Sequence, residues 1–254
     1  MTKPCRIHCL VAIAAATITQ SYAQTPVSST FQLGVYADAN QTNGGYQQDY
    51  LIQSQTGTLN PYSGSLALTD HDPLHSGRSL TVRSSAAATW TDAAHGTVQW
   101  RGMGWDHNTN AQSASKLNGF VVNGPVWSYT FVADANSTFS MTYDVRGSRL
   151  TFGLLGATIE WSGTEGGLDL TNPYTPVAAG LFTRTMTAGE TYTVGLANMG
   201  NIFTSLDPRV GSGTLDADFN WSIGPVPEPS SFVALSGLLL ITLRRKQRKE
   251  ATRK

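Results

Sequence analysis

Apolar and polar residues alternate with a period of two along much of the chain. The clearest alternation lies in residues 138–145. One face of this segment would carry its apolar side chains: Phe139, Met141, Tyr143 and Val145. Because successive side chains of a strand point to opposite faces of a sheet, this pattern predicts a half-buried β-strand.

The same period recurs elsewhere, whereas long helical periodicity is missing. Strands are predicted in five further segments: residues 31–37, 97–100, 127–132, 191–196 and 215–223. The last segment would bury one row of side chains: Leu215, Ala217, Phe219, Trp221 and Ile223. The core of the protein is therefore expected to lie between sheets rather than between helices.

Turn-forming residues separate these runs. They include Asn60-Pro61, Asp72-Pro73, Gly166-Gly167 and Ala188-Gly189. The spacing predicts roughly ten to thirteen strands at intervals of about 10 to 20 residues. The expected fold is all-β, an antiparallel two-sheet sandwich of the jelly-roll type, formed by residues 24–224. Residues 211–213 are expected to form a turn, and residues 224–229 a linker.

The last segment, residues 225–254, differs from the rest of the chain. It begins with Val226, Pro227, Glu228, Pro229 and Ser230, continues as an apolar run over residues 232–243, and then turns basic at Arg244, Arg245 and Lys246. The two prolines hold the backbone around Glu228 extended. Basic residues next to a membrane span stay on the cytoplasmic side. The segment therefore predicts a single C-terminal transmembrane helix with a basic stop.

The apolar run is short for a membrane span. Residues 229–243 would form a helix of roughly 22 Å at about 1.5 Å per residue, against a hydrocarbon core of about 30 Å. A buried core helix is therefore the alternative. Snorkelling of Arg244 and Arg245, with local thinning of the bilayer, narrows the gap. A core helix is also seldom followed by a run like residues 244–249, in which all but Gln247 are basic and none is acidic.

This order of motif, span and stop resembles the PEP-CTERM sorting signal of Gram-negative bacteria. The motif is Val226-Pro227-Glu228-Pro229-Ser230, the span is residues 232–243, and the stop is Arg244-Arg245-Lys246. In that family a membrane protease, exosortase, recognises and cuts the tail, and the proteins reach a surface that usually carries exopolysaccharide. The resemblance implies an exosortase-type protease and the membrane as partners. Residues 187–192, expected to open a hairpin, and residues 85–90 also resemble strands of secreted PEP-CTERM and jelly-roll ectodomains.

Residues 1–23 have the three parts of a secretory signal peptide. Lys3 and Arg6 form the positive region, residues 9–18 the apolar region, and Ser21-Tyr22-Ala23 the cleavage site. An N-terminal transmembrane anchor is the alternative, which the shortness of the apolar run disfavours. We therefore expect export, first to an inner-membrane anchor with a periplasmic body, then to the cell surface or the medium after processing.

The predicted body, without the two terminal segments, has a different net charge from the whole chain. The whole chain has 17 basic and 17 acidic residues. Residues 24–226 hold only eight of the basic residues but fifteen of the acidic ones, so the net charge of this part is −7. A body of this charge does not bind nucleic acid by neutralising phosphates. It also lacks cysteine, because Cys5 and Cys9 precede it. Disulfides, thiolate metal sites and a cysteine nucleophile are excluded from it.

The densest polar cluster is Asp70-His71-Asp72-Pro73-Leu74-His75. Carboxylates and imidazoles this close are potential ligands of zinc or a similar ion. On a strand, however, Asp70 and Asp72 share one face and His71 points away. We favour an exposed Asx-type turn whose side chains cap their own backbone. No metal and no other cofactor is assigned.

Glycoside hydrolysis requires two carboxyl groups about 5 to 10 Å apart. Glu160 beside Trp161 is the best single candidate, because an aromatic neighbour can desolvate an acid and favour its neutral form. No second carboxylate can be tied to it, and no serine has the Gly-x-Ser-x-Gly context of a nucleophile. A solvated acid on a strand is the simpler interpretation, so no catalytic residue is assigned.

All six tryptophans lie in the predicted body. Flat aromatic rings stack on the apolar faces of sugars, while Asp and Asn bind the hydroxyl groups. Residues 100–108 carry that mixture in a predicted loop, which makes Trp105, Asp106 and Asn108 the candidate glycan contacts. The alternative is core packing, which we expect for Trp127 and Trp221 in their alternating strands.

Asp216, Asp218 and Asn220 match the first three ligand positions of an EF-hand calcium loop. The match ends there, because Trp221 stands where the loop needs glycine and Pro227 where it needs glutamate. We expect a strand whose polar residues face solvent instead.

These features predict an exported protein that is sorted through its C-terminal tail. For the body we favour a non-catalytic binding or structural module associated with exopolysaccharide. A surface hydrolase acting on polysaccharide is the alternative.

Overall fold

The computed structural model describes residues 24–39, 47–74, 77, 79–108, 118–121, 125–147, 154–170, 177–203 and 211–225. Thirteen strands make up most of these residues. Nowhere in these ranges does a helix occur that is long and apolar enough to cross a membrane. The predicted signal peptide, sorting motif, apolar run and basic stop lie outside the described residues.

The first of two antiparallel sheets, sheet A, has seven strands. They are β1 (Gln24–Asp38), β2 (Gln47–Thr56), β6 (Asn118–Val121), β7 (Pro125–Ala133), β9 (Leu154–Trp161), β10 (Leu168–Asp169) and β12 (Thr191–Phe203). Their order is β10-β9-β12-β6-β1-β2, and β7 also pairs with β1 and β12. Strands β6 and β7 thus occupy one position in the sheet, one after the other.

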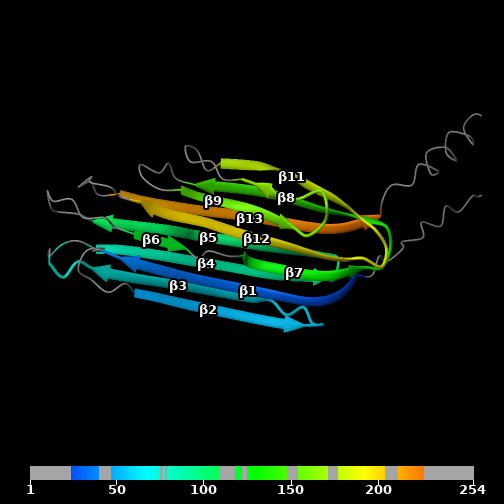
Figure 1. Ribbon diagram of the computed structural model, residues 1–254, viewed down its shortest axis with the longest axis horizontal. Helices are drawn as coiled ribbons and strands as arrows, with labels where there is room; N and C mark the ends of the chain where they lie inside the picture. The colour runs from blue at the N-terminus through cyan, green and yellow to red at the C-terminus, as the bar shows by residue number, and fades with distance from the viewer. Residues whose placement is uncertain are drawn as a thin grey trace, which may run out of the picture.

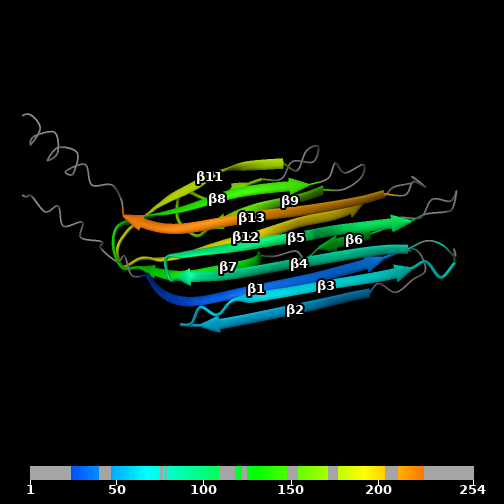
Figure 2. The ribbon, with the colours of Figure 1, turned by 180° about the vertical axis from the view of Figure 1, so that it is seen from behind.

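The second sheet, sheet B, has six strands. They are β3 (Tyr62–His71), β4 (Ser79–Asp92), β5 (His95–Asn108), β8 (Ser137–Gly147), β11 (Val177–Met186) and β13 (Gly211–Pro225). Their order is β11-β8-β13-β5-β4-β3. The two sheets lie face to face along the long axis of the molecule (Figures 1 and 2).

From β5 onward the chain crosses between the sheets at most connections. The last strand, β13, lies between β5 and β8, and β12 lies between β7 and β9. This interleaving of strands from distant parts of the chain is that of Greek keys, as in jelly rolls. Strands β1 to β4 widen both sheets on one side. The predicted all-β, antiparallel two-sheet sandwich is confirmed.

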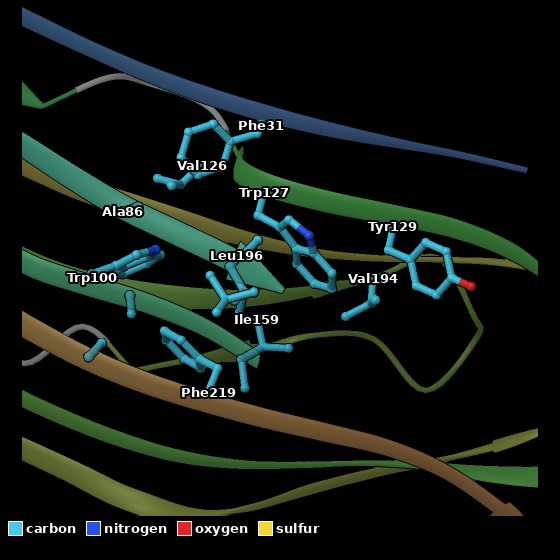
Figure 3. Close-up of a cluster of buried hydrophobic side chains, with 14 of the residues drawn as sticks. Phe31, Ala86, Trp100, Val126, Trp127, Tyr129, Ile159, Val194, Leu196 and Phe219 are labelled. Atoms are coloured by element: carbon cyan, nitrogen blue, oxygen red, sulfur yellow. The ribbon is translucent and has the colours of Figure 1, made fainter. Parts of the chain in front are cut away.

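The core between the sheets is rich in aromatic rings (Figure 3). Trp127 from sheet A and Trp221 from sheet B are both buried, with ring centroids 6.3 Å apart. The Tyr129 ring lies 5.4 Å from that of Trp221. Full burial of a large apolar side chain contributes roughly 1.5–3 kcal/mol, so such rings are a main source of stability. The predicted core positions of Trp127 and Trp221 are confirmed, as is the buried row of residues 215–223.

The start of β1 and the end of β13 lie at the same end of the sandwich, which we call the terminal end. Gln24 pairs with Ala133 at the end of β7, and Pro225 pairs with Ser137 at the start of β8. Residues 134–136 join these two strands. We call the opposite end, where β5 finishes and β13 begins, the far end. Figure 1 shows the terminal end on the right.

Two predicted irregular segments are strand instead. Residues 211–213 open β13 and pair with β5. Gly104 allows this, since a Cβ there would lie 1.8 Å from the Gly213 carbonyl oxygen; the glycines serve a close strand contact and not a turn. At the other end of β13, Gly224 and Pro225 still pair with β8, so the strand reaches into the predicted linker.

The predicted hairpin at residues 187–192 is also wrong. Strand β11 belongs to sheet B and β12 to sheet A, so the connection crosses the sandwich. The amide of Gly189 (φ 82°) donates to the Ala133 carbonyl at 2.7 Å, which ties the turn to sheet A. A short turn with glycine fits a hairpin and a crossing equally well, because both require only a sharp reversal of the chain.

Candidate functional site

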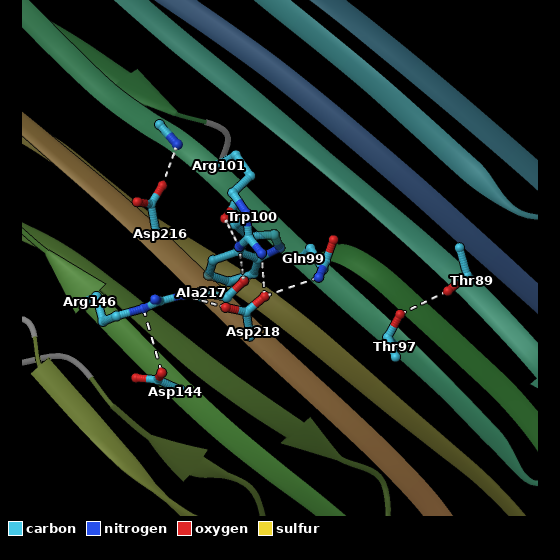
Figure 4. A network of polar contacts seen from close by, with 11 residues as sticks. Thr89, Thr97, Gln99, Trp100, Arg101, Asp144, Arg146, Asp216, Ala217 and Asp218 are labelled. Atoms are coloured by element: carbon cyan, nitrogen blue, oxygen red, sulfur yellow. Dashed lines mark hydrogen bonds and ion pairs between the residues drawn. The ribbon is translucent and has the colours of Figure 1, made fainter.

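A band of charged side chains crosses the outer face of sheet B (Figure 4). This charged band comprises Arg83 on β4, Arg101 and Asp106 on β5, Asp216 and Asp218 on β13, and Asp144 and Arg146 on β8. On β13 the period-two pattern places Asp216 and Asp218 here, since the residues on either side of them are buried. The band thus joins four neighbouring strands and extends from the middle of β13 toward the far end.

Asp218 is the centre of the charged band. Its Oδ1 pairs with Nη2 of Arg101 and its Oδ2 with Nη2 of Arg146. Nε2 of Gln99 donates a further hydrogen bond to Oδ1 at 3.2 Å. The Asp218 side chain is 25% exposed, whereas those of Arg101 and Arg146 are 47% and 53% exposed. Two half-exposed guanidinium groups from β5 and β8 therefore flank one carboxylate.

A β-bulge positions Arg101 in this arrangement. The register of β13 against β5 shifts between Leu215 and Ala217. Opposite the shift, Gly102 has φ 56°, and its amide donates to Oδ1 of Asp216 at 2.6 Å. Nη1 of Arg101 donates to the Ala217 carbonyl at 3.1 Å. Because bulges redirect side chains, the Arg101 side chain reaches from β5 to Asp218 on the neighbouring strand β13.

The remaining members of the charged band form pairs at its two sides. Arg83 pairs with Asp106 across β4 and β5, and Nε of Arg146 lies 3.5 Å from Oδ2 of Asp144. Exposed pairs of this kind contribute only about 0–1 kcal/mol each. The charged band therefore fixes the positions of charges on the surface more than it stabilises the fold.

Hydroxyl groups cover other parts of both outer faces. Hydrogen bonds of 2.8 Å join Thr69 to Thr81 and Thr89 to Thr97 on sheet B. On sheet A, Thr30 and Ser128 share a hydrogen bond of 2.6 Å. Pairs of this kind hold hydroxyl groups in register across strands. Together with the charged band, they line the outer face of sheet B with hydrogen-bond donors and acceptors.

The candidate glycan contacts Trp105, Asp106 and Asn108 belong to β5, so the predicted loop at residues 100–108 is wrong. Within this strand Gly102 serves the bulge and Gly104 the close approach to β13. Asp106 belongs to the charged band through its pair with Arg83. The side chains of Trp105 and Asn108 lie outside the described part of the structure.

In the cluster at residues 70–75 the favoured Asx turn is present at Asp72, but it is not exposed, and Asp70 caps a distant segment instead of its own backbone. Asp70 and Asp72 are both buried and His71 is exposed. Oδ2 of Asp70 accepts the amide of Ala39 at 2.7 Å, and Oδ1 of Asp72 accepts that of Leu74 at 2.9 Å, which is an Asx turn. Within the described ranges, no group of three or more His, Cys, Asp or Glu residues could hold a metal ion.

Glu160 and Trp161 point to opposite faces of sheet A. Glu160 is exposed, with its carboxylate over Gly195 of β12, while Trp161 is buried in the core. The suggested desolvation of Glu160 by this ring is therefore wrong, because neighbours on a strand cannot share a face. Asp216 and Asp218 likewise face outward while Phe219 and Trp221 are buried, so the strand interpretation is confirmed over the calcium loop.

Sequence reasoning missed a carboxylate–imidazole pair at the terminal end. Oδ1 of Asp92 lies 2.8 Å from Nδ1 of His95 and accepts the amide of Ala94 at 2.7 Å, in the turn between β4 and β5. Burial alone would raise the pKa of Asp92, but the hydrogen bonds from His95 and Ala94 and the nearby imidazole outweigh it and lower the pKa. Burial raises the pKa of nearby Tyr129, and the charge of Asp92 adds to the effect.

Sequence reasoning also missed the charged band as a unit. Each strand shows alternating polar residues, but nothing in the sequence shows that β13 pairs with both β5 and β8. The spacing Asp-x-x-His at residues 92–95 was the one local signal that pointed to the carboxylate–imidazole pair.

Comparison with known proteins adds little to this description. No family model matches the chain, and no curated protein matches it. The structure of infectious bursal disease virus Gx strain is 12% identical over 82% of this chain, with a TM-score of 0.25. This chain covers 59% of that viral chain, less than two thirds of its length. The VP2 subviral particle of the same virus is 10% identical over 89% of this chain and 75% of its own, with a TM-score of 0.17. Likenesses this weak carry no argument about fold or function.

Proposed function

We propose that this chain is an exported surface protein, sorted through a PEP-CTERM tail, whose sandwich is a non-catalytic module that binds exopolysaccharide. The carrying observation is the charged band, in which half-exposed Arg101 and Arg146 flank Asp218 on a flat outer face. Guanidinium groups bind carboxylate and hydroxyl oxygens with directed hydrogen bonds. The ligand-binding surface in this proposal is the outer face of sheet B.

The geometry of the acidic side chains favours binding over hydrolysis. A glycosidase requires an acid with a raised pKa and a second carboxylate facing it. In the charged band, Asp218, Asp144 and Asp106 pair with guanidinium groups, and Asp216 caps a backbone amide. Each of these carboxylates is thus occupied by a donor of the protein itself, which suits a role in positioning.

The position of the C-terminal strand supports a sandwich that is tethered to the membrane through its tail. The body ends at the terminal end with β13, whose Pro225 pairs with Ser137, and the sorting motif begins at the next residue, Val226. A tail anchored in the membrane would leave the body from this end. The charged band extends from the middle of the sandwich toward the far end, on the side away from the tail.

Binding can be tested with protein recovered from the cell surface and exopolysaccharide from the same cells. We expect Arg101→Gln combined with Arg146→Gln to weaken binding about tenfold or more, since a hydrogen bond to a charged group contributes about 1.5–3 kcal/mol. Glu160→Gln, a charge change on the outer face of sheet A, is the matched control and should bind normally. Unchanged binding by the arginine variant would reject the sheet B surface.

The same samples test the alternative function. Released reducing ends are measured in parallel for the wild-type chain and for Glu160→Gln. Sugar release that is lost in Glu160→Gln would establish a hydrolase and contradict the proposal. Intact-mass analysis of the recovered protein tests the sorting: loss of the segment after about Pro229 indicates processing, and an intact tail contradicts it.

A further inference from the structure

The charged band carries no excess of positive charge. It contains three guanidinium groups and four carboxylates, so its net charge is −1. Residues 24–226 as a whole have a net charge of −7. Exposed charges act on a ligand within a Debye length, which is about 8 Å at physiological ionic strength. This surface therefore repels a polyanion more than it attracts one.

Every guanidinium group of the charged band already has a carboxylate of the protein as its partner. Arg101 and Arg146 share Asp218, and Arg83 pairs with Asp106. A carboxylate of a ligand would compete with these partners for the same donors. It would also lie close to the aspartates, where like charges oppose its binding. An acidic sugar therefore gains little from these arginines.

Arginine and aspartate side by side match the hydrogen bonding of hydroxyl groups. A guanidinium group only donates hydrogen bonds and an ionised carboxylate only accepts them, whereas a hydroxyl group does both. Two hydroxyl groups on adjacent carbon atoms of a sugar can therefore accept from an arginine and donate to the aspartate beside it. A carboxylate or a protonated amine of a sugar matches only one member of each pair.

The most accessible pair of this kind lies on β8. Nε of Arg146 is 3.5 Å from Oδ2 of Asp144, and the two side chains are 53% and 52% exposed. Each keeps capacity for a ligand, because a guanidinium group has further N–H groups and a carboxylate has a second oxygen. Figure 4 shows this pair beside Asp218, which pairs in turn with Arg101. Donors and acceptors thus alternate from β8 across β13 to β5.

The charged band is also wider than one sugar ring. It crosses from β4 through β5 and β13 to β8, which are neighbouring strands of sheet B. Neighbouring strands lie about 4.8 Å apart, so the three intervals between these strands amount to roughly 14 Å. A polymer that lies across the strands can contact several arginine–aspartate pairs at once, whereas a single sugar reaches one.

We propose that the outer face of sheet B binds a neutral polysaccharide through hydroxyl groups on adjacent carbon atoms, and that it excludes acidic polysaccharides. One hydroxyl group accepts a hydrogen bond from Arg146 and its neighbour donates one to Asp144. The pair of Arg101 and Asp218 binds a further sugar of the same polymer. This inference rests on the proposed function, because it names the class of exopolysaccharide that this surface binds.

Chemical modification of the polymer tests the inference with protein recovered from the cell surface. The exopolysaccharide of the same cells is used untreated, after reduction of its carboxyl groups to alcohols, and after periodate oxidation, which cleaves the bond between carbon atoms with adjacent hydroxyl groups. We expect binding to stay unchanged or become tighter after carboxyl reduction. Periodate oxidation should weaken it about tenfold or more, since one lost hydrogen bond to a charged group has about this effect.

The outcomes separate the inference from the proposed function. Binding that is lost on carboxyl reduction, or kept after periodate oxidation, would overturn the inference and leave the proposed function standing. If neither the untreated nor the reduced polymer binds, the proposed function fails and the inference fails with it.

Asp144→Ala gives an independent test, because the sign of its effect depends on the ligand. Loss of an acceptor should weaken the binding of a neutral polymer about tenfold, whereas loss of a negative charge would tighten the binding of an acidic one. Asp134→Ala, the same change at an exposed residue of the terminal end, is the matched control. Circular dichroism and thermal melting check that both variants fold. Unchanged or tighter binding by Asp144→Ala would overturn the inference.

Discussion

Asp216 on β13 and Gly102 on β5 are joined by a hydrogen bond of 2.6 Å at the point where the registers of the two strands shift. The acceptor is a carboxylate oxygen and the donor is the backbone amide of a residue with φ 56°. An acidic side chain thus satisfies a donor at the bulge, and the same bulge directs Arg101 toward Asp218. Local backbone geometry and the charged band therefore depend on each other.

Removal of the Asp216 carboxylate should loosen the bulge. We expect Asp216→Ala to lower the free energy of unfolding by about 1 kcal/mol, because a backbone amide loses a charged acceptor at a partly exposed site. Asn220→Ala, on the same face of β13, is the control and should change little. Urea unfolding followed by tryptophan fluorescence measures both, and equal effects would contradict a specific role of Asp216.

The energetic effect of the positive φ at Gly102 can be separated from that of steric contacts. An added Cβ meets nothing within 4 Å at Gly102 or at Gly224, but only Gly102 has positive φ. We expect Gly102→Ala to cost about 1 kcal/mol or more, because a left-handed backbone strains any residue with a Cβ.

Gly224→Ala is the matched control for this substitution. It should be neutral or slightly stabilising, since alanine restricts the unfolded chain. Thermal melting of the two variants side by side gives the comparison. If both melted alike, the cost could not come from the backbone conformation at Gly102.

The ion pairs of Asp218 should depend on salt. Asp218→Asn removes the charge shared by Arg101 and Arg146, and we expect a loss of roughly 0.5–1 kcal/mol at low ionic strength, because these side chains are partly exposed. The loss should diminish at about 1 M salt, where the Debye length falls to about 3 Å. Unfolding at low and high salt tests this, and a loss that does not change with salt would point to packing instead.

Asp92 should contribute to stability in a defined range of pH. Its pKa is lowered below the ordinary value of 3.8 in the folded protein. The contribution is therefore complete above that value and is lost as the pH falls through the folded pKa. We expect Asp92→Asn to be less stable than the wild type at pH 7.

The difference between the two proteins should shrink on acidification below 3.8. Chemical unfolding of both at several acidic pH values measures it. His95→Ala, which removes one of the hydrogen bonds, should give part of the same effect. A difference that stayed constant into strong acid would contradict a role for the ionised carboxylate.

The sequence alone determined several of the strands and which of their side chains face the core. The alternation in residues 138–145 and 215–223 predicted β8 and β13, with Met141 and Phe219 buried. The Asx turn at Asp72 was equally predictable. These properties depend on neighbours within a few residues, since side-chain direction and turn capping are local.

Only the tertiary structure decided which strands pair. Arg101, Arg146 and Asp218 meet because β13 lies between β5 and β8, and each strand offers similar donors and acceptors to any partner. The bulge at Gly102 and the crossing at residues 187–190 are decided in the same way. Strand pairing depends on the closure of the whole sandwich around one core, and no short segment of the chain encodes that arrangement by itself.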